Sequence, residues 1–270
     1  MAILLQGIFY FLLSFLLIIL SSRLVLQQAF AYVPSEPISL WYFLIVFVFV
    51  TALLVFLLRR VKTRLPFEVF FTLAIFAGIW FLADIWLTPG LAILAALAIT
   101  LLKFIYPRIW WQNLIMVFGI CGIVVSLGLS ISWVTAVVIL VLLSFYDIIA
   151  VYFTRHMVAM FNGLIKRGVV FALILPNNLK SQFLPLKEVK PGEDFMLLGT
   201  GDLALPAILV SSLVRESMGQ AILAALGAVL GFVIMNIIFS RQEARKPMPA
   251  LPPIAAGASL GFLIALLIGL

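Results

Sequence analysis

The feature that most constrains this chain is a series of nine long apolar runs separated by short polar segments. A run of about 20 apolar residues can cross the hydrocarbon core of a bilayer as an α-helix, whereas a membrane barrel needs alternating strands of about 10 residues. These runs do not alternate, so they predict helices. The expected spans are residues 2–22, 40–58, 66–87, 89–102, 111–129, 132–153, 195–214, 219–239 and 252–270. The sequence therefore predicts an all-α membrane protein with about nine transmembrane helices.

The composition excludes a soluble domain, because 66% of the residues are hydrophobic and only 10% are charged. Cytoplasmic loops of membrane proteins carry an excess of Lys and Arg. With the N-terminus in the cytoplasm, 15 of the 17 basic residues fall on the cytoplasmic side, and only Arg23 and Arg215 fall outside. The sequence therefore predicts a cytoplasmic N-terminus and an outside C-terminus. The net charge of +7 is scattered over several loops, so we expect no nucleic-acid partner.

The spans divide the chain into two groups. Residues 1–153 form a six-helix part, residues 154–194 form a cytoplasmic connecting loop, and residues 195–270 form a three-helix part. Within the loop, residues 163–175 fit either a short interfacial helix or a strand, and their pattern alone does not decide between the two.

Two acidic residues lie well inside predicted spans, Asp147 and Asp202. Asp147 precedes the cytoplasmic end of its span by six residues, and Asp202 follows the cytoplasmic start of its span by seven. At the rise of an α-helix, both would lie roughly 9–10 Å below the cytoplasmic surface. A carboxylate in hydrocarbon is costly and usually marks a partner, a cavity or a pathway. We therefore expect the two side chains to face each other.

A pair of neighbouring carboxylates suits aspartyl proteolysis. Both cannot ionise cheaply, so the pair shares a proton. The ionised carboxylate takes a proton from an attacking water, and the protonated one donates to the peptide carbonyl. Gly199 and Gly201 remove side chains from the turn before Asp202, and Pro206 removes a hydrogen bond beyond it. These residues favour an open, deformable segment that admits water.

A third segment at the same boundary is proline-rich. Residues 245–253 lead into the last span, and prolines at positions 249, 252 and 253 remove backbone donors there. We expect an extended backbone there, level with the two acids.

Three short motifs together resemble a known family. The pair YD at 146–147, GTGD at 199–202 and PALP at 249–252 resemble the YD, GxGD and PALP motifs of the presenilin and signal-peptide-peptidase family, and the chain looks like a short, prokaryotic-type member. The resemblance implies an intramembrane aspartyl protease in which Asp147 and Asp202 are catalytic. It also implies a set of substrate-binding residues, namely Tyr146, Gly199, Gly201, Pro249, Ala250 and Leu251.

The resemblance further implies partners and a location. The expected partners are transmembrane-helix substrates and the lipid bilayer, a homo-oligomer remains open, and the location is the plasma membrane of a prokaryote. A helical substrate must unwind before it is cut, so we expect its backbone to pair with the residues running into Gly199 and with residues 249–251. The predicted topology favours substrates whose N-terminus lies outside.

Other chemistries are weaker matches to the residues. With one His and one Cys, the chain lacks the ligands of a zinc site, and we expect no metal or cofactor. Ser259 lies in a serine-nucleophile pattern, but the single histidine, His156, follows the sixth span as a loop residue. Two alternatives stay open: a prepilin-peptidase-like aspartyl protease, and a proton-coupled transporter or ion pathway that uses the paired acids.

Overall fold

The computed structural model describes residues 2–28, 37–61, 63–154, 170–189, 194–242 and 247–270. Nine α-helices account for most of this described part: α1 (Ala2–Gln27), α2 (Leu40–Arg60), α3 (Leu65–Trp86), α4 (Pro89–Ile105), α5 (Ile109–Ser130), α6 (Trp133–Ile148), α8 (Thr200–Leu213), α9 (Met218–Ser240) and α10 (Leu251–Leu267). Each predicted span overlaps one of them. Within the described ranges, six helical segments are long and apolar enough to cross a membrane, whereas α4, α8 and α10 are shorter. The predicted all-α membrane class fits, with the exception of one small sheet.

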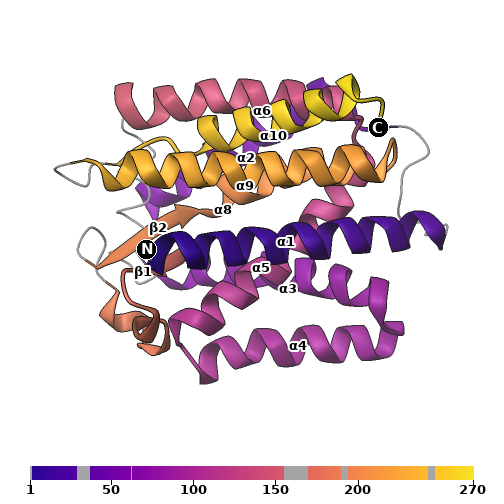
Figure 1. The fold of residues 1–270 in the computed structure, drawn as a ribbon. Coiled ribbons are helices and arrows are strands. Elements are labelled where there is room, and N and C mark those ends of the chain that lie inside the picture. Colours follow the sequence, from indigo (N-terminus) through magenta and orange to yellow (C-terminus); the bar gives the residue numbers. More distant parts are fainter. Residues whose placement is uncertain (1, 29–36, 62, 155–169, 190–193, 243–246) are drawn as a thin grey trace.

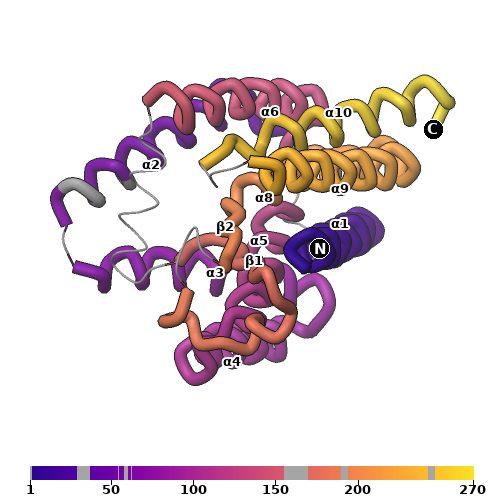
Figure 2. Tube along the Cα trace, turned by 60° about the vertical axis from the view of Figure 1, so that its left-hand side comes forward, coloured from indigo at the N-terminus to yellow at the C-terminus, as the bar shows by residue number. Residues whose placement is uncertain are grey.

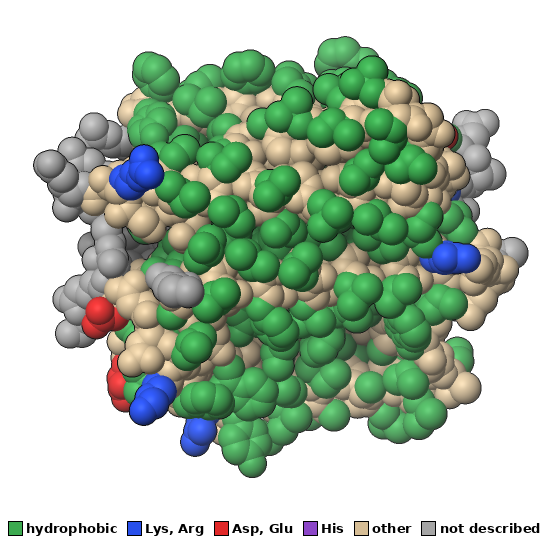
Figure 3. Space-filling model, viewed as in Figure 1, with side chains coloured by type: hydrophobic (Ala, Val, Ile, Leu, Met, Phe, Trp, Pro, Cys, Tyr) green, Lys and Arg blue, Asp and Glu red, His purple; other side chains and the backbone are tan. Residues whose placement is uncertain are grey.

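The helices run roughly along a common axis, and the two ends of the chain lie at opposite ends of the bundle (Figure 1). Hydrophobic side chains cover the broad middle of the face seen in Figure 3, and the charged side chains on that face lie toward its edges. An apolar surface of this extent marks a contact with other apolar matter, which for a bundle of apolar helices is lipid. The chain is a multi-pass integral membrane protein.

A two-stranded antiparallel sheet lies at the end of the bundle near the N-terminus (Figure 1). Strand β1 (Ala172–Pro176) pairs with β2 (Phe195–Gly199), with Ala172 opposite Gly199 and Pro176 opposite Phe195. The strand alternative for the predicted loop is thus correct from Ala172 onward, and residues 163–169 lie outside the described residues. The prediction of one helix over 195–214 is wrong at its start, because an apolar run suits a buried strand as well as a helix.

Local sequence accounts for most helix starts. A serine hydroxyl accepts a backbone N–H of the first turn at Ser39 for α2, Ser132 for α6 and Ser217 for α9. Proline occupies one of the first helical positions of α3, α4 and α10, where its missing N–H costs nothing. Helix α6 continues into a π-helical turn, η1 (Ile149–Phe153), so the predicted sixth span is helical to its end.

The bundle has a tightly packed side and an outlying helix. Helices α9 and α10 cross at Gly227 and Gly257, where a Cβ on either glycine would collide with the carbonyl group of the other. By contrast, none of the described side chains in the apolar stretch of α2 is buried, and α2 lies on the flank of the bundle away from α1 and α9 (Figure 2). The close α9–α10 contact fixes the N-terminal end of α10, which matters for the site below.

Candidate active site

Asp147 is a buried carboxylate on α6. Its side chain is only 5% exposed, and its Oδ2 accepts a hydrogen bond from the backbone N–H of Leu251 at 3.3 Å. Leu251 is the first residue of α10, 104 positions further along the chain. The first N–H groups of a helix have no partner within the helix and carry a partial positive charge. The start of α10 therefore supports negative charge on Asp147.

Asp202 lies in the first turn of α8, directly after β2. Its carboxylate accepts a hydrogen bond from the Gly199 backbone, and Asp147 is close enough for the two carboxylates to interact electrostatically. A Cβ on Gly199 would stand 3.0 Å from Oδ2 of Asp202, so a side chain there would crowd the carboxylate. The structure thus brings together the two acids that the sequence singles out.

The depth estimate for Asp202 needs correction. Residues Phe195–Gly199 are extended, and α8 begins only at Thr200, so Asp202 is in a first turn rather than seven residues into a helix. A strand rises about 3.3 Å per residue against 1.5 Å for a helix. The equal depth inferred from the helical rise therefore does not hold, although the expected pairing does.

The proline-rich segment also differs in part from expectation. Residues 247–250 have no regular structure, but Leu251 already begins α10 and both following prolines belong to its first turn. The prediction of extended backbone up to residue 253 is therefore wrong for its last three residues. Because Pro252 and Pro253 have no N–H, Leu251 supplies the only donor among the first three helical residues. Ala250 and Leu251 are both buried, at 8% and 3% exposure.

The other expected substrate-binding residues border this site. The ring of Tyr146 packs edge-on against Phe47 of α2, with centroids 6.2 Å apart. Gly201 is exposed, and a Cβ there would meet nothing within 4 Å. Tyr146 thus links the site to the outlying helix, and Gly201 leaves open space beside Asp202.

Three side-chain amides close the outer edge of β1. Asn113 donates to the carbonyl of Ile174 at 2.8 Å and accepts its N–H at 2.9 Å. At either end, Gln6 donates to the Pro176 carbonyl and Gln112 to the Val170 carbonyl. We call Gln6, Gln112 and Asn113 the amide clamp. The sequence analysis did not identify it, and the available signal was the placement of amides inside or at the start of apolar spans.

The outer edge of β2 is different. Ile174 directs both its backbone groups toward Asn113, so its opposite residue, Leu197, must direct its own N–H and C=O away from β1. Among the described residues, none hydrogen-bonds to the Leu197 backbone. Gly199, two residues on, belongs to the same edge and contacts Asp202. The open edge of the sheet therefore leads directly to the aspartate pair.

No group of three or more His, Cys, Asp or Glu side chains that could hold a metal ion occurs in the part of the chain that the structure describes. His156 lies outside the described residues. Two carboxylates, one buried beside the start of α10 and one partly buried in the first turn of α8, can hold a proton and exchange it with water, as an aspartyl site in a membrane requires.

The comparisons identify the family. The family model described as signal-peptide peptidase, presenilin aspartyl protease matches residues 7–269, and the chain belongs to this family. It is accordingly an enzyme, an intramembrane aspartate protease, and the prepilin-peptidase and transporter alternatives lose their support. No curated protein sequence matches the chain.

Two solved structures are similar in fold. A presenilin family intramembrane aspartate protease in a C222 crystal form aligns with a TM-score of 0.70 and 22% identity, covering 98% of this chain and 99% of that one. A presenilin family protease in a P2 crystal form aligns with a TM-score of 0.65 and 24% identity, covering 95% and 96%. At these identities, the likeness supports the fold.

Proposed function

We propose that this chain hydrolyses peptide bonds within or near the transmembrane helices of single-span membrane proteins, with Asp147 and Asp202 as the catalytic pair. The observation that carries this proposal is the meeting of the two carboxylates where α8 and α10 begin. They come from helices on opposite sides of the connecting segment, so nothing in the local sequence requires them to meet. Two acids placed together inside a membrane protein are costly, and that cost calls for a chemical purpose.

In the proposed mechanism, the pair holds one proton. The ionised carboxylate removes a proton from a water, whose oxygen bonds to the peptide carbonyl carbon, while the protonated carboxylate donates to the carbonyl oxygen. The C–N bond then breaks, and the departing nitrogen takes a proton from the pair. The Leu251 N–H and the Gly199 backbone each stabilise negative charge on one carboxylate.

We propose that the substrate adds as a strand to the outer edge of β2. An unwound helix exposes backbone groups that cost several kcal/mol each when unpaired in a membrane, about 4 kcal/mol or more in a hydrocarbon-like medium. Leu197 offers one N–H and one C=O on that edge, and the amide clamp closes the other edge of the sheet. An added strand would run past Gly199 and the open space at Gly201 toward Asp202.

The remaining substrate-binding candidates complete this proposal. Pro249 and Ala250 precede the Leu251 contact with Asp147, so they would flank the substrate on the side opposite β2. Tyr146 would lie between the substrate and α2. Substrates that unwind easily near their cytoplasmic end, through Gly or Pro, should be cut faster.

We also propose the membrane arrangement. The chain crosses the membrane nine times, with its N-terminus in the cytoplasm and its C-terminus outside, in the plasma membrane of a prokaryote. Residues 1–153 supply Asp147, residues 154–194 connect the two parts on the cytoplasmic side, and residues 195–270 supply Asp202. The termini at opposite ends of the bundle support an odd number of crossings.

The test is proteolysis by the purified chain in liposomes that contain single-span substrates, with the products identified by mass spectrometry. Asp147→Ala and Asp202→Ala should each lower the cleavage rate by about 10²–10⁴-fold or more, because each removes one half of the acid–base pair. Asp84→Ala is the matched control, since Asp84 is an acid of α3 outside the site, and it should cut normally. If a folded Asp147→Ala or Asp202→Ala protein still cleaves the substrate, the assignment of these two residues as the catalytic pair is wrong.

A further inference from the structure

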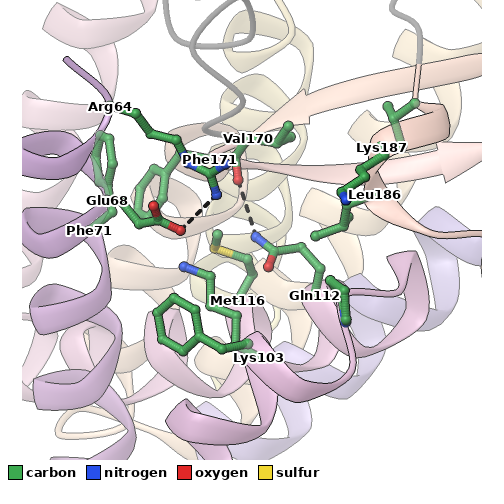
Figure 4. Close-up of a pocket in the computed structure, with 13 residues that line it drawn as sticks. Arg64, Glu68, Phe71, Lys103, Gln112, Met116, Val170, Phe171, Leu186 and Lys187 are labelled. Atoms are coloured by element: carbon green, nitrogen blue, oxygen red, sulfur yellow. Dashed lines mark hydrogen bonds and ion pairs between the residues drawn. The ribbon is translucent and has the colours of Figure 1, made fainter.

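A cavity of about 310 Å³, with charged and apolar side chains in its lining, lies where the ends of α3, α4 and α5 meet the residues before β1 (Figure 4). Neither aspartate lines it. Its volume is at the lower end of the range of about 300–1,000 Å³ that is typical of small-molecule sites. Its place at the end of three apolar helices puts it at the level of the lipid headgroups, on the same side as the sheet.

The charged side chains of this cavity are mostly basic. Arg64, Lys103 and Lys187 line it together with a single acid, Glu68. Arg64 and Glu68 form an ion pair at 2.8 Å, and Figure 4 shows Arg64 and Lys103 approaching Glu68 from different sides. Neither Lys103 nor Lys187 forms an ion pair with a described residue. Three cations and one acid leave the site with an excess of positive charge, which favours an anion.

Apolar side chains form the rest of the cavity wall. Phe71 and Phe171 stack there with ring centroids 4.2 Å apart. Phe104, which lines the cavity, and Ile105, which follows it at the end of α4, are 52% and 65% exposed. A ligand with both a negative group and long apolar chains fits this combination better than a free inorganic anion does.

Gln112 adds a specific requirement. Its Nε2 donates to the Val170 carbonyl, but its Oε1 is buried without a hydrogen-bond partner in the described part of the chain, and the residue is only 3% exposed. A buried amide oxygen without a partner carries a desolvation cost, so it calls for a donor. A hydroxyl on the ligand would meet it.

We propose that this cavity binds the headgroup of an anionic phospholipid such as phosphatidylglycerol, with its phosphate among Arg64, Lys103 and Lys187 and a headgroup hydroxyl on Oε1 of Gln112. Basic pockets between transmembrane helices are a general mode of lipid-headgroup binding. The acyl chains would lie along the exposed face of α4. Because Gln112 also holds Val170, bound lipid would brace the segment that leads into β1.

The test compares lipid retention by the purified full chain. The protein is taken from nanodiscs of mixed phosphatidylglycerol and phosphatidylcholine, and bound lipid is counted by native mass spectrometry. The double variant Lys103→Gln with Lys187→Gln removes two positive charges from the cavity. Its retention of phosphatidylglycerol should be roughly 25-fold lower, about fivefold for each basic residue near an anionic group. The matched control is Lys180→Gln, because Lys180 is an exposed lysine of the neighbouring 3-10 turn outside the cavity, and it should retain the lipid.

Three results would overturn the proposal: equal retention of the two lipids by the unsubstituted protein, an equal loss in the Lys180→Gln control, or displacement of phosphatidylglycerol by inorganic phosphate. The last result would assign the site to a free anion. If the double variant fails to fold, Lys187→Gln alone serves, since Lys187 is exposed, and it should reduce retention about fivefold.

Discussion

The two edges of the β1–β2 sheet differ in the property that decides whether a strand accepts a further partner. On the β1 edge, the amide clamp occupies the carbonyls of three residues and the N–H of one. Pro176 on this edge has no N–H to offer, so Ala172 is the outward-facing residue of β1 whose N–H and C=O have no partner among the described residues. On the β2 edge, the N–H and C=O of Leu197 have no partner among the described residues.

This difference shows how the protein manages a sheet inside a membrane. An open strand edge is a liability in any protein, and unpaired backbone groups are more costly still where water is scarce. The chain closes most of one edge with side chains from α1 and α5. It leaves the other edge open, and that edge leads to Asp202. The open edge therefore has the position expected of a substrate-binding edge.

The largest effect should come from closing the open edge. Leu197→Pro removes an N–H that points away from β1, so it leaves the β1–β2 ladder intact. A substrate carbonyl left without its donor costs about 1–3 kcal/mol, so kcat/KM should fall by about 5- to 150-fold. Leu197→Ala keeps the N–H and should stay near the original activity. Equal activity of the two variants in a cleavage assay would show that the substrate does not pair with this edge.

The next effect should come from opening the closed edge. Asn113→Ala removes two hydrogen bonds to Ile174 and leaves that buried N–H and C=O unpaired. We expect the free energy of unfolding to fall by about 2 kcal/mol, while cleavage by the folded fraction falls less than in Leu197→Pro. Denaturation in detergent micelles measures the first quantity. A strong loss of activity without a loss of stability would contradict a purely structural role for this edge.

Much of this architecture can be predicted from the sequence with one argument. Charged side chains and unpaired backbone groups are costly in free energy inside a membrane. That cost places the helices in the apolar runs, and it marks Asp147 and Asp202 as a pair, because no other acids lie deep in a span. The family match over residues 7–269 bears out the class of enzyme inferred from the three motifs.

The same argument could not separate strand from helix. An apolar run such as residues 195–199 fits a buried helix as well as a buried strand. These residues form β2 because β1 lies beside them in the folded protein, and the local sequence does not reveal that contact. The proline run ahead of α10 was likewise ambiguous, since proline suits both an extended segment and the first turn of a helix. The amide clamp depends on partners 58 to 170 positions away, which a single sequence does not reveal.

The smallest effect should come from Gln6, at the end of the closed edge farthest from Asp202. Its Nε2 donates to the Pro176 carbonyl at 3.2 Å, but its Oε1 is buried without a partner in the described structure. Gln6→Ala loses a hydrogen bond and also removes an unpaired acceptor, so these two contributions offset each other, and the free energy of unfolding should fall by about 1 kcal/mol or less.

The control for this substitution is another glutamine that binds a backbone carbonyl. Gln220 donates to the Leu270 carbonyl at 2.7 Å, but this hydrogen bond is exposed to solvent, so Gln220→Ala should change the free energy of unfolding even less. Cleavage should stay within about twofold of the original in both variants, since Pro176 pairs with Phe195, at the end of the sheet away from Gly199. If Gln6→Ala instead slowed cleavage as much as Leu197→Pro, while Gln220→Ala did not, the closed edge would also serve the substrate. The two edges would then be equivalent in function despite their different hydrogen bonding.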